Sequence, residues 1–315
     1  MNRGADQRGQ ARDSACGRGR TRQKPRGGSK MTTTFRWYVL AFLAVSVAAT
    51  AAPDPARERL LEETAANVLP AGGYQSRVVL GDSIIKLIRG GVIDPEKLEA
   101  IYARRGGIPV ELQGTLSRPS YRPIRLTRKN AGVYVNQLWP LGLANWMAAN
   151  KFSPLNGPSR LTFASTGGWN LGREKNGGVY FNRFPIVRLT AQQEALVAEV
   201  ARHTYRPCCN NSTFFQDCNH GSALLGLLAL GAAQGLTEKE LYREALAFNA
   251  FWFPSTYVHT ALYFKAVRNI QWQDVDAREV MGAEFSSATG WQTKVARELV
   301  RRGLLPGQGG ANCSA

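Results

Sequence analysis

The segment 222–234 is the feature that most constrains the fold of this chain. Placed on a helix, its residues are apolar on almost every side, and Gly235 ends it. A helix that is hydrophobic all round has no face suited to water and has to be buried. The rest of the chain must therefore surround this segment. Small residues would let neighbouring helices approach it closely, namely Gly221, Ala223, Gly226 and Ala229.

Two capping boxes predict the helices on either side of this segment. Thr190 with Gln193, and Thr237 with Glu240, each pair a capping hydroxyl with a side chain that can reach back to the cap amide. Caps, apolar spacing and glycine stops indicate further helices over 57–63, 81–89, 94–102 and 290–302. The caps of 255–264 favour a helix there as well, whereas its β-branched and aromatic content would suit a strand. The stretch 108–189 is rich in Pro and Gly, and its short apolar pieces cannot be assigned. We predict a mainly α fold: a single helical domain with long irregular connections and at most minor β structure.

The formal charge of +17 is concentrated at the N-terminus. Residues 1–30 hold nine Lys and Arg and only two Asp, and Arg36 adds one more positive charge. The remaining +9 is spread along the chain, and no recognition module interleaves it with aromatic residues. We therefore expect a solvated basic surface and no nucleic-acid partner. Residues 1–30 lack a core-forming pattern and are interpreted as a basic leader or a wrongly assigned start.

Residues 31–51 have the pattern of a secretory signal peptide that begins near Met31. Arg36 precedes an apolar stretch, 37–47, that is shorter than the roughly 20 residues of a membrane span. The small residues at 49–51 fit a cleavage site. We predict an exported protein, periplasmic or secreted, with no stable membrane span after cleavage; an uncleaved N-terminal anchor is the alternative. The mature domain would then be 52–315, ending in a flexible tail, 303–315.

The loop 203–220 gathers the side chains that bind soft metals and carry thiol chemistry. It holds three of the five cysteines of the chain, and Cys313 in the tail is the fourth that would remain after cleavage. Three sulfurs and one imidazole match the donor number of a tetrahedral zinc site or a soft copper site. We predict that a metal ion, zinc or copper, is bound by Cys208, Cys209, Cys218 and His220, with His203 and Cys313 as spare ligands.

Two neighbouring features bear on this metal hypothesis. Cys218 is expected at the start of a helix, where the thiolate that a metal requires is favoured. Asp217 is expected to orient the ring of His220. The adjacency of Cys208 and Cys209 departs from the two-residue spacer that is usual between chelating cysteines.

Disulfide chemistry is the alternative use of the same thiols. In an oxidising compartment an exposed thiol is usually paired or bound to metal, and four cysteines can form two disulfides. These bonds would be a structural staple in a protein without catalytic function. In a thiol–disulfide redox protein, Cys313 would instead exchange with the loop.

Two resemblances accompany these interpretations. Asp217-Cys218 at the start of an apolar helix resembles the nucleophile position of NlpC/P60 cysteine peptidases, which implies Cys218 as nucleophile and His259 as base acting on cell-wall peptides. The chain departs from that family because Asn219-His220 follows the cysteine where the family has Ser-Gly. The whole mature chain resembles a family of exported bacterial proteins through the motif R-P-C-C-N-N…D-C-N-H-G at 206–221, with 138–145 and 163–169 beside it. This second resemblance implies export and a single domain but no particular activity.

Overall fold

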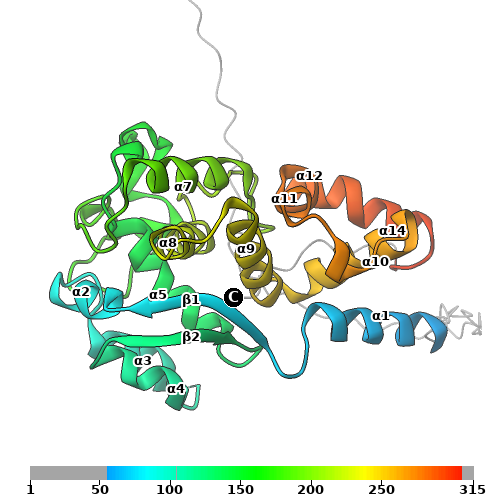
Figure 1. Ribbon diagram of the computed structural model, residues 1–315, viewed down its shortest axis with the longest axis horizontal. Helices are drawn as coiled ribbons and strands as arrows, with labels where there is room; N and C mark the ends of the chain where they lie inside the picture. The colour runs from blue at the N-terminus through cyan, green and yellow to red at the C-terminus, as the bar shows by residue number, and fades with distance from the viewer. Residues whose placement is uncertain (1–54, 104, 307–315) are drawn as a thin grey trace, which may run out of the picture. The chain divides into compact units, whose positions relative to one another are not determined.

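Helix α8 (Asn219–Ala233) has the central position that its apolar sequence predicts (Figure 1). In the computed structural model, helices α5 (Ala131–Ala144), α7 (Ala191–His203) and α9 (Glu238–Trp252) pack against it. All residues in 221–232 are buried. The prediction of a mainly helical fold built around this segment is confirmed.

The structure describes residues 55–103 and 105–306, which belong to one unit, Ala52–Ala315. The basic leader and signal peptide expected over 1–51 lie outside the described residues, and so does Cys313. No helix in the described part of the chain is long and apolar enough to cross a membrane.

Helices α5 and α8 cross at unusually short range because glycines stand on both sides of the contact. A Cβ atom added to Gly142 would lie 1.8 Å from the carbonyl oxygen of Ser222, and one added to Gly226 would lie 2.5 Å from that of Leu138. The hydroxyl of Ser222 also donates to the carbonyl of Trp139 at 3.0 Å. Ser222 lies in the first turn of α8, so this contact fixes the end of the helix at which the cysteine loop arrives.

Both predicted capping boxes are present. Thr190 and Gln193 begin α7, and Thr237 and Glu240 begin α9; in each the hydroxyl accepts from the third amide and the third side chain accepts from the cap amide. The starts of α7 and α9 are thereby set, and the loop 204–218 joins the end of α7 to the start of α8.

A two-stranded antiparallel sheet is the β structure of the described residues. Strand β1 (Tyr74–Gly81) pairs with β2 (Ser120–Leu126), in a register that places Tyr74 opposite Leu126. The buried carboxylate of Glu244 on α9 ties β1 to the helices. It accepts from the Tyr74 hydroxyl at 3.0 Å, the Ser76 hydroxyl at 2.6 Å and the Arg77 amide at 2.8 Å.

The other elements follow the chain around this core. Between β1 and β2 lie α2 (Ser83–Arg89), α3 (Pro95–Ala103), α4 (Val110–Gln113) and η1 (Gly114–Leu116), while α1 (Pro55–Val68) precedes β1. The segment 145–190 contains only short turns, as its Pro and Gly content predicts: η2 (Ala148–Phe152), η3 (Pro154–Asn156), η4 (Pro158–Leu161), α6 (Ala164–Gly167) and η5 (Gly177–Val179). After α9 come α10 (Pro254–Arg268), η6 (Trp272–Asp274), α11 (Ala277–Met281), α12 (Ala283–Ser286), α13 (Ala288–Trp291), η7 (Gln292–Ala296) and α14 (Arg297–Arg301).

The C-terminal part departs from expectation in two details. The helix predicted over 290–302 is divided by a π-helical turn, η7. The start of the expected flexible tail folds back: the amide of Leu304 donates to the carbonyl of Leu299 at 2.9 Å, and Leu304 and Leu305 pack against the core. The rest of the tail, 307–315, lies outside the described residues.

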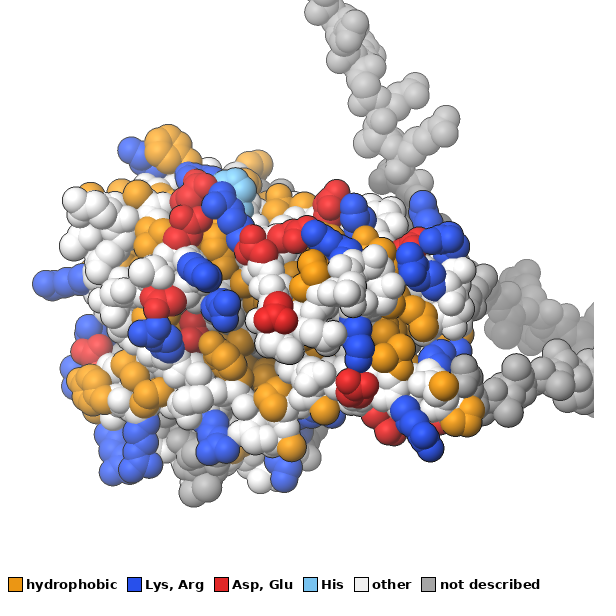
Figure 2. All heavy atoms as spheres, turned by 45° about the vertical axis from the view of Figure 1, so that its right-hand side comes forward, with side chains coloured by type: hydrophobic (Ala, Val, Ile, Leu, Met, Phe, Trp, Pro, Cys, Tyr) orange, Lys and Arg blue, Asp and Glu red, His pale blue; other side chains and the backbone are white. Residues whose placement is uncertain are grey.

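The surface of the described residues mixes charges of both signs. Figure 2 shows one face, on which Lys and Arg are interspersed with Asp and Glu and hydrophobic side chains are scattered between them. On this face the positive charge is therefore spread among acidic groups.

Candidate metal centre

The cysteine loop, 204–218, is held in place by backbone hydrogen bonds to elements on both sides. Its Tyr205 amide donates to the carbonyl of Met281 at 2.8 Å, and its Phe214 amide donates to the carbonyl of Ala201 at 3.0 Å. The carbonyl of Cys209 accepts from the amide of Ala288 at 2.9 Å. These bonds fold the loop back on itself between α7 and the α11–α13 segment, and residues 208 and 209 arrive beside residue 218.

The three loop cysteines form one cluster. Their Sγ atoms all lie within 4.8 Å of one another, and those of Cys208 and Cys218 are 3.5 Å apart. A disulfide requires a separation of about 2.05 Å, so the three described cysteines are free thiols. All three residues are partly exposed. A cluster of this kind can hold a metal ion.

Cys218 occupies the N-cap of α8. Its backbone is extended, with φ −128° and ψ 164°, and its Sγ accepts a hydrogen bond from the amide of Gly221 at 3.4 Å. The free amides at a helix N-terminus carry partial positive charge and favour an anionic sulfur. The sequence prediction that a helix starts at this cysteine is confirmed.

Arg206 supports the cluster from inside the protein. Its side chain is 0% exposed, and its Nε donates to the Sγ of Cys218 at 3.2 Å. The other guanidinium nitrogens donate to the carbonyls of Asn211 at 2.7 Å and Phe215 at 2.9 Å, and to the carboxylate of Asp217. One buried cation thus fixes both ends of the loop and touches a cluster sulfur.

Gly221 makes room for this arginine. A Cβ atom at position 221 would lie 2.5 Å from the Cζ of Arg206 and 2.7 Å from its Nε. A guanidinium with all three nitrogens hydrogen-bonded cannot move aside easily. Glycine is therefore required one turn into α8 for the arginine to reach the sulfur.

Asp217 has a different partner from the one expected. Its carboxylate is paired with Arg206 and also accepts from the side-chain amide of Asn211 at 2.7 Å. Among the described residues, no hydrogen bond joins it to His220. Asp217 therefore orients Arg206 and the loop.

The electrostatics separate the three thiols. Hydrogen bonds from Cys208 and Cys209, together with the charge of Arg206, hold the pKa of Cys218 well below its usual range. Hydrogen bonds with Cys209 and Cys218, and burial, raise the pKa of Cys208. The hydrogen bond with Cys208 lowers the pKa of Cys209, but the one with Cys218 and burial outweigh it and raise that pKa to about 11. These shifts favour the thiolate at Cys218 and the protonated thiol at Cys208 and Cys209, with the guanidinium of Arg206 beside the Cys218 sulfur.

The two histidines predicted as ligands lie outside the group of mutually close ligand atoms. The ring of His220 packs against the rings of Phe253 and Trp252, with centroid distances of 4.5 and 5.7 Å, and burial lowers its pKa. His203 is in the last turn of α7, as predicted, where its Nδ1 is 2.9 Å from the carbonyl oxygen of Glu199 and 3.1 Å from its carboxylate. The structure thus brings together the sulfurs of the predicted set and gives both rings other contacts.

The candidate catalytic pair is not assembled either. His259 lies on α10 with its ring stacked on that of Trp291, at a centroid distance of 6.2 Å. Burial lowers its pKa, and no hydrogen bond joins it to Cys218 in the described part of the chain. The roles of Cys218 as nucleophile and His259 as base therefore stay a prediction.

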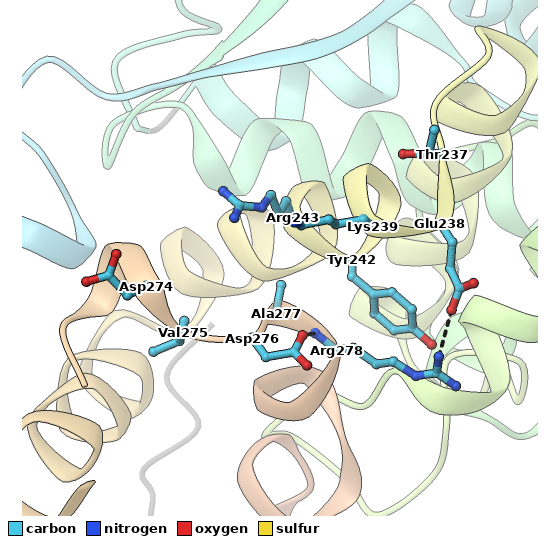
Figure 3. Close-up of a pocket in the computed structure, with 10 residues that line it drawn as sticks. All are labelled: Thr237, Glu238, Lys239, Tyr242, Arg243, Asp274, Val275, Asp276, Ala277 and Arg278. Atoms are coloured by element: carbon cyan, nitrogen blue, oxygen red, sulfur yellow. Dashed lines mark hydrogen bonds and ion pairs between the residues drawn. The ribbon is translucent and has the colours of Figure 1, made fainter. Parts of the chain in front are cut away.

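A charged cleft near the start of α9 contains none of these thiols (Figure 3). Its volume is 580 Å³, and side chains from 237–243 and 274–278 line it. Arg278 pairs with Glu238 at 3.0 Å and its amide donates to Asp276 at 2.9 Å. Among the described residues the group of converging ligand atoms is the cysteine cluster and not this cleft, so we place the functional site at the cluster.

Comparisons with protein-family models, with curated proteins and with solved structures give no match. The resemblance of the cysteine motif to a family of exported bacterial proteins, and the exported location itself, therefore stay predictions. The chemistry of the site has to be argued from its own geometry.

Proposed function

We propose that this protein binds a thiophilic metal ion, zinc or copper, through Cys208, Cys209 and Cys218. The observation that carries the proposal is that the three sulfurs lie within 4.8 Å of one another at the surface end of a buried helix. Thiolates are the donors that such ions prefer, and an ion at the centre of the three would contact them all.

The surroundings of the cluster support the same proposal. Arg206 and the N-terminus of α8 stabilise one thiolate before any metal arrives. The hydrogen bonds of Arg206 and Asp217 hold the loop in the folded chain, so the ligands are positioned in advance. A site that is positioned in advance does not spend binding energy on ordering its ligands.

Metal titration under reducing, oxygen-free conditions tests the proposal. The wild type is expected to retain one equivalent of metal per chain after desalting. The single Cys208→Ser, Cys209→Ser and Cys218→Ser variants are each expected to lose it. His203→Ala is the matched control, because this residue lies outside the cluster and is exposed. If the wild type retains no more metal than the triple serine variant, the proposal is wrong.

One contact favours a second function, thiol–disulfide exchange. The sulfurs of Cys208 and Cys218 are 3.5 Å apart, close enough to join after a small movement. The Cys218 thiolate would attack one sulfur of a small disulfide and release the other as a thiolate. Cys208 would then give its proton to that thiolate and attack the Cys218 sulfur, which releases the second group as a thiolate and leaves an internal disulfide.

Counting thiols after exposure to oxidised glutathione, with metal absent, tests this second function. The wild type and Cys209→Ser are each expected to lose two alkylatable thiols without retaining glutathione. Cys208→Ser is expected to retain glutathione as a stable mixed disulfide on Cys218. A wild type that keeps all its thiols after long exposure would exclude exchange at this site.

A further inference from the structure

We infer that the site selects monovalent copper over the zinc ion, and that it holds one copper ion between three sulfurs. This inference rests on the proposed metal-binding function and specifies its ligand. It depends on the number of donors that meet, on the engagement of the neighbouring donors, and on the free directions at the Cys218 sulfur.

The number of ligand atoms that converge at the site suits Cu(I) better than zinc. Within 55–103 and 105–306, the group of His, Cys, Asp and Glu ligand atoms that meet at one point consists of the three cysteine sulfurs. Structural zinc sites almost always have four protein ligands in a tetrahedron. Soft thiolates are donors for both Cu(I) and zinc, but Cu(I) is satisfied by two or three of them, so the number of donors decides between the ions. Three converging sulfurs therefore suit Cu(I) and leave a zinc ion one ligand short.

The nearest possible fourth donors are engaged elsewhere. An oxygen of Asp217 is 3.9 Å from the sulfur of Cys209, but this carboxylate is paired with Arg206 and accepts from Asn211 at 2.7 Å. The ring of His220 packs on Phe253 with centroids 4.5 Å apart. A zinc ion would have to break one of these arrangements or complete its shell with water. A three-coordinate ion needs neither change.

The Cys218 sulfur has few directions left for metal. It accepts from the Nε of Arg206 at 3.2 Å and from the amide of Gly221 at 3.4 Å. A thiolate sulfur has three lone pairs, so one is left on the side of the other cysteines, where a bound metal ion would replace the hydrogen bond with Cys208. Cys218 can then bind one ion terminally but cannot bridge two. The inferred site holds a single copper ion, which distinguishes it from a multinuclear copper–thiolate cluster.

Competition between metals tests this inference in the intact protein. Cu(I) is titrated without oxygen against a chromogenic Cu(I) chelator, and zinc is titrated separately against a chromogenic zinc chelator. We expect one equivalent of Cu(I) that displaces bound zinc completely, and X-ray absorption that shows sulfur neighbours only. Failure to bind either ion would contradict the metal-binding function itself. Zinc that resists displacement by Cu(I), or a second copper ion per site, would overturn only the inference.

The variant His220→Phe separates three-sulfur binding from a set that includes imidazole. Phenylalanine keeps a ring against Phe253 and Trp252 but has no nitrogen donor. Cu(I) affinity is expected to change by less than about threefold, whereas Cys218→Ser is expected to weaken it by more than about 100-fold. A correctly folded His220→Phe variant that loses Cu(I) as completely as Cys218→Ser would show that the ring is a ligand and would refute the three-sulfur site.

Discussion

Replacing Arg206 by methionine is the most informative single perturbation of this fold. The side chain is 0% exposed and donates to Cys218, to two loop carbonyls and to Asp217. Methionine fills much of the volume but leaves the carboxylate of Asp217, which is 15% exposed, with only the Asn211 amide and the Cys209 thiol as side-chain partners among the described residues. Removing one member of a buried ion pair typically costs about 3–5 kcal/mol. We expect a loss of that size in the free energy of unfolding.

Urea unfolding, followed by circular dichroism, measures this loss. The variant Arg297→Met is the control, because Arg297 is exposed on α14 and should cost no more than about 0.5 kcal/mol. The double variant Arg206→Met/Asp217→Asn should be less destabilised than the two single variants added together, because it leaves neither charge alone. A loss below about 1 kcal/mol for Arg206→Met, or strict additivity in the double variant, would refute the role assigned to the pair.

The same variant reports on the sulfur chemistry. The charge of Arg206 is one cause of the lowered pKa of Cys218, after the hydrogen bonds from Cys208 and Cys209. In Arg206→Met we expect that pKa to rise part of the way toward the ordinary cysteine value. The ultraviolet absorbance of the thiolate, measured against pH, follows this change. An unaltered titration would show that the guanidinium does not stabilise the thiolate.

Three further predictions concern affinity and stability. The pKa of Cys208 is raised and that of Cys209 is about 11, so binding metal to all three sulfurs displaces two protons. Chelator competition should therefore show a metal affinity that rises about 100-fold per pH unit near neutrality, and a pH-independent affinity would contradict this. Gly142→Ala should lower the free energy of unfolding, measured by thermal unfolding, by about 1–3 kcal/mol because its Cβ meets the α8 backbone. Gly132→Ala, whose Cβ would have nothing within 4 Å, should be neutral or slightly stabilising, and equal effects of the two variants would refute the close crossing. Glu244→Ala should cost about 2–4 kcal/mol in urea unfolding because it leaves three donors of β1 unpaired, and a loss under about 0.5 kcal/mol would contradict that contact.

The sequence is most informative where one local signal decides the outcome. The caps at Thr190 and Thr237 fix where α7 and α9 begin, since each needs only residues three apart. The apolar segment after Cys218 could only be a buried helix, and so the thiol had to sit at its start. The meeting of the three sulfurs also follows from their short separation along one loop.

Other parts of the fold depend on contacts that no local pattern records. Helix α5 is buried on nearly all sides and contains Pro140, so it shows neither amphipathic spacing nor an uninterrupted helical composition. The strands β1 and β2 form only through their pairing with each other, and their nearest ends, Gly81 and Ser120, are 39 residues apart along the chain. Their pairing is therefore a long-range property.

The supporting residues of the site were missed for a related reason. The sequence does not distinguish a buried arginine from an exposed one, and only the position of Arg206 inside the cysteine motif could have indicated its role. His220 is adjacent to the cluster in sequence, but the first turn of α8 carries its ring toward Phe253. Adjacency along a helix start does not set the direction of a side chain.

The hydrogen bonds that hold the cysteine loop reach far along the chain. Tyr205 is anchored by Met281 and by the side-chain amide of Asn249, and the carbonyl of Cys209 is anchored by Ala288. The sixteen-residue motif 206–221, grafted onto another scaffold, would bring its sulfurs without these distant anchors. An engineer who wants a portable metal-binding peptide from this protein would therefore have to transplant α9 and the helices after it as well.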